Sequence, residues 1–296
     1  MNKFSRKYKL NSMKNLSNSE ILVTFKEDRD VFRPYGITCE RWAPQTMGKF
    51  DRHNEIELNY IPSGSLSYFY HNRHITVPER KLSLFWGLLP HKITDFKDVS
   101  YYYVVTIPLS VFLSWKLPAT FVNDVLNGCL LTDNDSRFEE FDRFMIDNWM
   151  SDIDNNCQDI MLLDIQSRLM RLSRGYTLEG NDRQGISSGV NTIEKMAVYI
   201  AQNYRSPIKM SDIGEAAGLN PDYANSLFRK AFGHTLSEHV MIERITCAQR
   251  RLVSSDDGIL QIAFDCGFNS ISSFNKAFRR INGCTPREYR KINSVS

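Results

Sequence analysis

Residues 259–290 read ILQIAFDCGFNSISSFNKAFRRINGCTPREYR, and they determine how the last third of the chain folds. Ile259, Ile262 and Ala263 have the spacing of a short amphipathic helix, and a Gly follows as a turn. Ser270 is a good N-cap for a second helix, whose inward residues are Phe274, Ala277, Phe278 and Ile281. Two short helices joined by a glycine turn predict a helix-turn-helix unit.

The same unit occurs earlier in the chain. Asn225, Phe228, Arg229, Gly233, Thr235 and Glu238 recur 50 positions later as Asn275, Phe278, Arg279, Gly283, Thr285 and Glu288. A fixed period indicates one structural unit used twice. Each second helix ends at a glycine, and each copy of Thr-x-x-Glu then predicts a capping box that starts the next helix.

Each unit should present polar side chains outward from its second helix. These are Asp222, Asn225, Ser226 and Arg229 in the first unit, and Ser272, Asn275, Lys276 and Arg279 in the second. Small polar and basic groups suit base edges and phosphates, so we expect these positions to contact DNA. The alternative is that the helices are purely structural and their outward charges are solvated. Two units in register with matching caps favour the DNA reading.

Length and charge support two domains. The 296 residues carry a net charge of +3, and residues 190–296 hold 14 Lys and Arg against 10 Asp and Glu. We expect a basic, loose tail at 1–20, an effector-binding and dimerisation domain at 21–173, a glycine-rich linker at 174–190 and a DNA-binding domain at 191–296. No apolar run approaches the roughly 20 residues that span a bilayer. The six cysteines lack metal spacing, which predicts reduced thiols in the cytoplasm.

The N-terminal domain is predicted to be β-rich. Residues 55–60 alternate between polar and apolar side chains, the pattern of a half-buried strand, and further short strands and turns follow up to residue 117. Helices are predicted over 136–173, where Ile165 and Leu169 belong to an apolar seam. The fold class is therefore α+β, with an antiparallel sandwich or small barrel followed by an all-α domain.

Residues 191–292 resemble the C-terminal domain of the AraC/XylS family of transcription regulators, through the stretch quoted above. The resemblance implies a seven-helix domain with two recognition helices in adjacent major grooves. Three N-terminal stretches, at 53–60, 84–91 and 112–117, resemble a sugar-responsive member of this family. The resemblance implies a cupin-like barrel, a homodimer, and an effector-responsive activator of sugar genes, plausibly for α-galactosides, that works with RNA polymerase. A regulator of virulence or stress genes with a non-sugar effector remains an alternative.

The candidate effector site combines polar and aromatic residues, namely His53, Glu57, Trp86 and His91. Aromatic faces suit pyranose rings and polar groups fix their orientation, so Trp42 and Trp115 are further candidates. His53, Glu57 and His91 also resemble a cupin metal motif in which Asp51 replaces the first histidine. A cupin metalloenzyme is thus a remote alternative, and the altered motif favours no metal, no cofactor and no catalysis.

Overall fold

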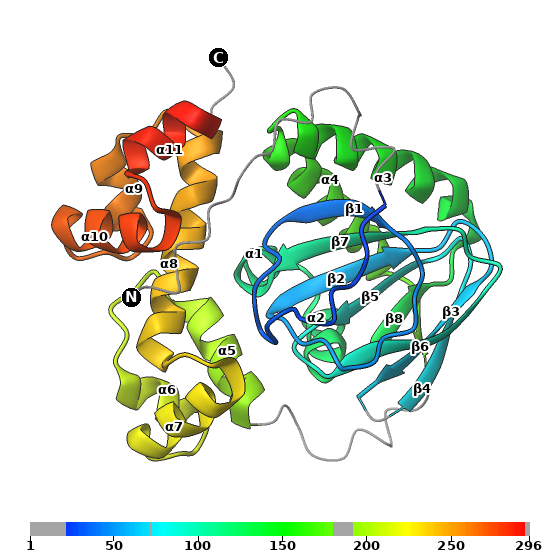
Figure 1. The fold of residues 1–296 in the computed structure, drawn as a ribbon, viewed down its shortest axis with the longest axis horizontal. Coiled ribbons are helices and arrows are strands. Elements are labelled where there is room, and N and C mark those ends of the chain that lie inside the picture. Colours follow the sequence, from blue (N-terminus) through cyan, green and yellow to red (C-terminus); the bar gives the residue numbers. More distant parts are fainter. Residues whose placement is uncertain (1–21, 72, 180–191, 294–296) are drawn as a thin grey trace.

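The computed structural model describes residues 22–71, 73–179 and 192–293. It contains a β-rich N-terminal part and a helical C-terminal part, which lie side by side (Figure 1). The mixed α and β composition and the order of the two parts agree with the expectation from sequence. The basic tail at 1–20 lies outside the described residues.

Two antiparallel sheets form the N-terminal part. The larger sheet has the order β1-β7-β2-β5-β8-β9 and the smaller one the order β4-β3-β6. Their strands are β1 (Thr38–Trp42), β2 (Glu55–Tyr60), β3 (Ser65–Tyr70), β4 (Arg73–Pro78), β5 (Leu82–Trp86), β6 (His91–Lys97), β7 (Tyr102–Pro108), β8 (Leu130–Asp133) and β9 (Tyr176–Glu179). The two ladders are separate among the described residues, so they do not close into one barrel. An apolar core that includes Trp42, Tyr68 and Phe85 fills the space between them.

Strand β2 is buried on both faces, which differs from the half-buried strand expected from its alternation. Its apolar residues, such as Ile56 and Leu58, join the core of the larger sheet. Its polar residues Glu57 and Asn59 are also buried, and they hydrogen-bond each other. The polar face of β2 therefore points into the protein rather than into solvent.

Helices cover the outer side of the larger sheet (Figure 1). They are α1 (Leu109–Ser114), α2 (Ala119–Leu126), α3 (Glu139–Asp154) and α4 (Gln158–Leu172). After α4 the chain returns to the sheet, because β9 pairs with β8. The first residues of the expected linker are thus an edge strand, and residues 180–191 lie outside the described part of the chain.

The C-terminal part contains seven helices over residues 192–293, the number implied by the family resemblance. They are α5 (Thr192–Asn203), α6 (Met210–Ala216), α7 (Pro221–Phe232), α8 (Leu236–Ser254), α9 (Ile259–Asp265), α10 (Ile271–Asn282) and α11 (Pro286–Asn293). Both predicted capping boxes are present, at Thr235 with Glu238 and at Thr285 with Glu288. None of the helices in the described residues is long and apolar enough to cross a membrane.

Candidate nucleic-acid interface and ligand cavity

Helices α6 and α7 form the first helix-turn-helix unit. Asn220 caps α7 by accepting a hydrogen bond from the Asp222 amide at 2.9 Å, and Pro221 occupies the first helical position. Ala224, Phe228 and Phe232 are buried against the rest of the domain. This inner face fixes the rotation of α7, so Asp222, Ser226 and Arg229 are exposed on the opposite side.

Helices α9 and α10 repeat the arrangement. Gly267 has a φ of +90°, and a Cβ there would lie 2.6 Å from the Tyr204 carbonyl oxygen, so only glycine fits this turn. Ser270 caps α10 through the Ser273 amide. Burial of Phe274, Ala277 and Phe278 leaves the predicted contact residues exposed, namely Ser272, Asn275, Lys276 and Arg279.

The two repeated asparagines differ in what they contact. The Asn225 Oδ1 atom accepts a hydrogen bond at 3.1 Å from the Leu236 amide, at the first turn of α8. The position equivalent to Leu236 in the second unit is Pro286, which has no N–H to donate. Asn275 is exposed and borders a hollow beside α10. The structure therefore gives Asn225 a structural contact and leaves Asn275 on the surface.

The hollow beside α10 is basic. Its lining includes Lys276, Arg279 and Arg287, and no acidic residue. Arg287 belongs to α11, so the helical pattern of α10 alone could not identify it. Helix α8, with 19 residues, joins the two units and is about 28 Å long. That length is of the order of one DNA turn, about 34 Å, which separates successive major grooves on one face of the duplex.

A cavity lies between the two sheets. Its lining combines aromatic, apolar and polar side chains: Phe25, Tyr35, Thr38, Trp42, Gln45, Met47, Asp51, Glu57, Tyr68, His91, Ile93, Tyr102, Val104 and Thr106. The Tyr68 hydroxyl is fully buried and has no hydrogen-bond partner among the described residues. The cavity volume is about 30 Å³, counted as the space that the centre of a water molecule can occupy. It therefore holds a few water molecules at most.

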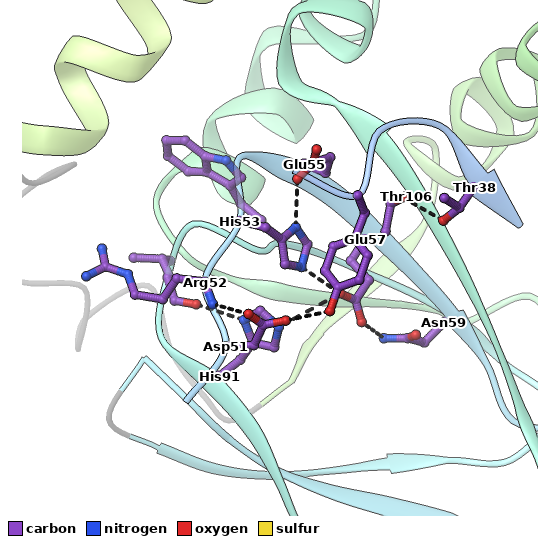
Figure 2. Close-up of polar contacts among 12 residues, drawn as sticks. Thr38, Asp51, Arg52, His53, Glu55, Glu57, Asn59, His91 and Thr106 are labelled. Carbon is purple, nitrogen blue, oxygen red and sulfur yellow. Dashed lines mark hydrogen bonds and ion pairs between the residues drawn. The ribbon is translucent and has the colours of Figure 1, made fainter. Parts of the chain in front are cut away.

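Charged and ionisable residues form a cluster on one side of this cavity, joined by hydrogen bonds and ion pairs (Figure 2). His53 lies between two carboxylates, with Nδ1 3.1 Å from a Glu55 oxygen and Nε2 3.0 Å from a Glu57 oxygen. His91 Nε2 lies 3.8 Å from the same Glu57 oxygen. Asp51 accepts hydrogen bonds at 2.8 Å from Arg29 and from the Tyr35 hydroxyl.

These contacts set the charges of the cluster. Burial disfavours a charged ring at His53, but the hydrogen bonds to Glu55 and Glu57 outweigh it and raise the pKa of His53 to about 9. The pKa of Glu57 is lowered although burial opposes it, because His53 donates to its carboxylate. Burial lowers the pKa of His91. At neutral pH the cluster thus holds a histidinium between two carboxylates, with a neutral histidine beside it.

The predicted effector residues fall in different places. Glu57 and His91 line the cavity, whereas His53 lies behind Glu57 and orients it. A Cβ at residue 87 would lie 2.2 Å from the His53 ring, so Gly87 makes room for it. Trp86 is fully buried in the core of the larger sheet, away from the cavity lining. Trp42, also a candidate from sequence, lines the cavity instead.

The cluster also has the elements of a metal site. Asp51, His53 and His91 each place one donor atom within 4.8 Å of the other two. Those donors are already engaged, because Asp51 bonds Arg29 and Tyr35 and both His53 nitrogens contact glutamates. The cluster is thus held together by its own hydrogen bonds, and the absence of a metal stays a prediction.

Comparison with known proteins links both parts of the chain to transcription regulators. A family model described as a helix-turn-helix domain matches residues 213–292. The melibiose operon regulatory protein of Escherichia coli K12 is 26% identical over 262 residues, covering 84% of this chain and 86% of that protein. The TetD protein of transposon Tn10 from Escherichia coli is 30% identical over 131 residues, covering 44% of this chain and 93% of that protein.

Two solved structures of regulators show low similarity to this chain. A regulator with an AraC-type DNA-binding domain from Chromobacterium violaceum is 25% identical, with a TM-score of 0.33, and covers 34% of this chain and 91% of that one. ToxT from Vibrio cholerae is 17% identical, with a TM-score of 0.38, and covers 88% of this chain and 99% of that one. These scores are too low to carry a structural argument.

Proposed function

Because the chain belongs to the AraC/XylS family of DNA-binding transcription regulators, we propose that it activates sugar-utilisation genes in the cytoplasm when an α-galactoside binds between its two sheets. The family assignment made from residues 259–290 is thereby confirmed, and the relatives found are regulators rather than enzymes. One observation carries the effector proposal. The cavity combines an aromatic wall with buried carboxylates, in a chain similar to the melibiose regulator along most of its length.

The cavity offers the chemistry that a sugar needs. Trp42 and Tyr102 supply aromatic surface for the apolar face of a pyranose ring. Asp51 and Glu57 accept hydrogen bonds from hydroxyls, and the unpartnered Tyr68 hydroxyl is free to donate one. The present volume is smaller than a pyranose, so binding requires the two sheets to move apart. Two facing antiparallel sheets around such a site support a cupin-like fold in which the two sheets are not hydrogen-bonded into one closed barrel.

The two helix-turn-helix units serve as the DNA-reading surface in this proposal. Ser226 and Arg229 on α7, and Asn275, Lys276 and Arg279 on α10, meet successive major grooves of one operator. Asp222 and Ser272 lie at the start of each helix, where their side chains are exposed. Asn225 acts through the start of α8 rather than through a base, since its side-chain oxygen is already bonded.

The surface of α3 and α4 supports a homodimer. The apolar side chains exposed on these helices are Phe141, Phe144, Ile160, Leu163 and Met170. The seam expected from sequence differs, because Ile165 and Leu169 are fully buried in the core of the sensor part. We therefore place the dimer contact on the opposite face of α4. A dimer brings two DNA-binding domains to one operator and RNA polymerase to its promoter.

Isothermal calorimetry on the full chain tests the effector. Melibiose, raffinose and galactose are titrated into the parent protein and into Trp42→Ala and Glu57→Gln. Asp95→Asn on the exposed side of β6 is the matched control. We expect a galactoside to bind the parent and the control, and both cavity variants to lose at least tenfold in affinity. Binding of a fatty acid, a bile salt or a metal ion, with no sugar bound, contradicts the proposal and favours the virulence or stress class.

A further inference from the structure

The two parts of the chain make direct contact. Helix α1 packs against α5, and the ring centroids of Phe32 and Phe232 lie 4.5 Å apart. Polar contacts surround this apolar patch. An Arg52 nitrogen lies 3.9 Å from a Glu194 oxygen at the start of α5, and the Asn54 amide lies 3.4 Å from His239 Nε2 on α8. The N-terminal part thus holds α5 and the first turns of α8.

The residues that make these polar contacts alternate with residues of the charged cluster beside the ligand cavity. Asp51, His53 and Glu55 exchange backbone hydrogen bonds with the segment Gly87–His91, and the chain bends at Asn54. The contacts of these residues and those of Arg52 and Asn54 lie on opposite sides of the segment. Asp51, His53 and Glu55 accordingly join the cavity cluster, whereas Arg52 extends away from it in Figure 2 and Asn54 contacts the DNA-binding domain. One five-residue segment therefore touches both the ligand cavity and α5 with α8.

The polar contacts between the two domains are poorly satisfied. Three buried oxygens have no hydrogen-bond partner in the described part of the chain, namely Asn54 Oδ1, Glu194 Oε2 and Glu243 Oε2. Leaving a buried acceptor unpaired destabilises the docked arrangement, because the oxygen loses its bonds to water. Burial raises the pKa of Glu243 to about 7, a further sign that its charge is poorly compensated. Separation of the two domains would return these oxygens to water, and this gain opposes the apolar packing that joins the two parts in one core.

We propose that the segment Asp51–Glu55 couples the cavity to the DNA-binding domain, so that a ligand bound to Asp51 and Glu57 releases α5 and α8 from the N-terminal part. The kind of ligand rests on the proposed function, but the route from the cavity to the DNA-binding domain does not depend on which ligand binds. A ligand that replaces the partners of Asp51 and Glu57 changes how the segment sits. Arg52 and Asn54 then leave contacts that are already long and incomplete. The released domain is free to take the orientation that its operator demands.

Hydrogen–deuterium exchange of the full chain tests this route without sugar or DNA. The cavity variants are Glu57→Gln and Asp51→Asn, so that a folding defect in one does not decide the result. The interface variant is Asn54→Ala, and Asp95→Asn is the matched control. We expect all except the control to speed exchange in α5 and in the first two turns of α8 at least threefold. Exchange in α10 and α11 should stay unchanged, and protection of β2 and β5 shows that the sheets remain folded.

The combination of variants identifies the route. Because cavity and interface act through one segment, Glu57→Gln with Asn54→Ala should speed exchange little more than the faster single variant. Faster exchange in Asn54→Ala with no change in either cavity variant would overturn the coupling, and so would fully additive effects. No change in Asn54→Ala would show that Asn54 does not help to hold α8, and would overturn the route through this segment.

Repeating the exchange measurement with a sugar added distinguishes failure of the proposed coupling from failure of the proposed sugar class. Melibiose is the probe, and it should also speed exchange in α5 and α8. If calorimetry shows that melibiose binds but exchange there is unchanged, the proposed release is wrong. If melibiose does not bind, the assigned sugar class fails, and the variants alone still decide whether the segment couples the two sites.

Discussion

Asn225 and Asn275 occupy the same place in their repeats, but replacing them by alanine should affect different properties. Asn225→Ala should lower the stability of α8, whereas Asn275→Ala should weaken operator binding. Asn225→Ala removes the acceptor for the Leu236 amide, a donor in the first turn of α8 that has no partner within the helix. A single hydrogen bond of this kind contributes about 1 kcal/mol, by comparison with capping residues and neutral hydrogen bonds. That free energy corresponds to an opening equilibrium that is about fivefold more favourable.

Asn275→Ala removes no such bond, because Pro286 has no amide hydrogen. An exposed substitution of this kind changes stability by about 0.5 kcal/mol or less. Its cost should fall on operator binding instead, at about 1–3 kcal/mol if the side chain reads a base. The assay is hydrogen exchange over the first turn of α8, paired with operator affinity on selected DNA. Equal exchange in the two variants, or a larger loss of affinity in Asn225→Ala, would refute the reasoning.

Two further predictions concern assembly and pH. The double variant Leu163→Glu with Met170→Glu changes exposed positions of α4, so it should stay folded and sediment with the mass of a monomer. Ile165→Glu changes a buried position and should instead unfold the N-terminal part. An unchanged mass in the folded double variant would argue against this dimer. The raised pKa of His53 means that the charged ring stabilises the folded sensor fully below pH 6.5, and that this stability is lost as the pH rises through about 9. Denaturant unfolding should show a loss on the order of 3 kcal/mol between pH 7 and pH 10, smaller in Glu57→Gln, and a flat profile would contradict the assigned charge.

The repeat in the sequence was sufficient to predict the two helix-turn-helix units, whereas the seven helices were implied by the family resemblance. Helical periodicity identified Ala224 and Phe228 as inward residues and left Arg229 outward. The same periodicity wrongly placed Ile281 inward, since its side chain is 42% exposed near the end of α10. The capping boxes were predictable for the same reason, since their donors and acceptors lie three residues apart. The role of Asn225 was not predictable, because its partner Leu236 is reached only after the chain turns at Gly233.

The cavity was less predictable from sequence than the helices. Alternation in residues 55–60 identified a strand, but it could not show that a second sheet covers the polar face and buries Glu57. Trp86 was chosen for the site and Trp42 was only a further candidate, yet the order of the strands places Trp42 in the cavity and Trp86 in the core. The glycines and polarity of residues 174–190 suggested a linker, yet residues 176–179 form an edge strand that needs only one bonded neighbour. The contact of Asn54 with α8 depends on two domains and has no local signal.

Footprinting of the full-length protein on its selected operator tests the central claim most directly. Each chain should protect two major-groove segments about one helical turn apart, because α8 separates α7 and α10 by about that distance. Lys276→Ala should weaken protection in one segment only, and Ser226→Ala in the other. A single protected segment per chain, or a Lys276→Ala footprint identical to that of the parent, would contradict the account.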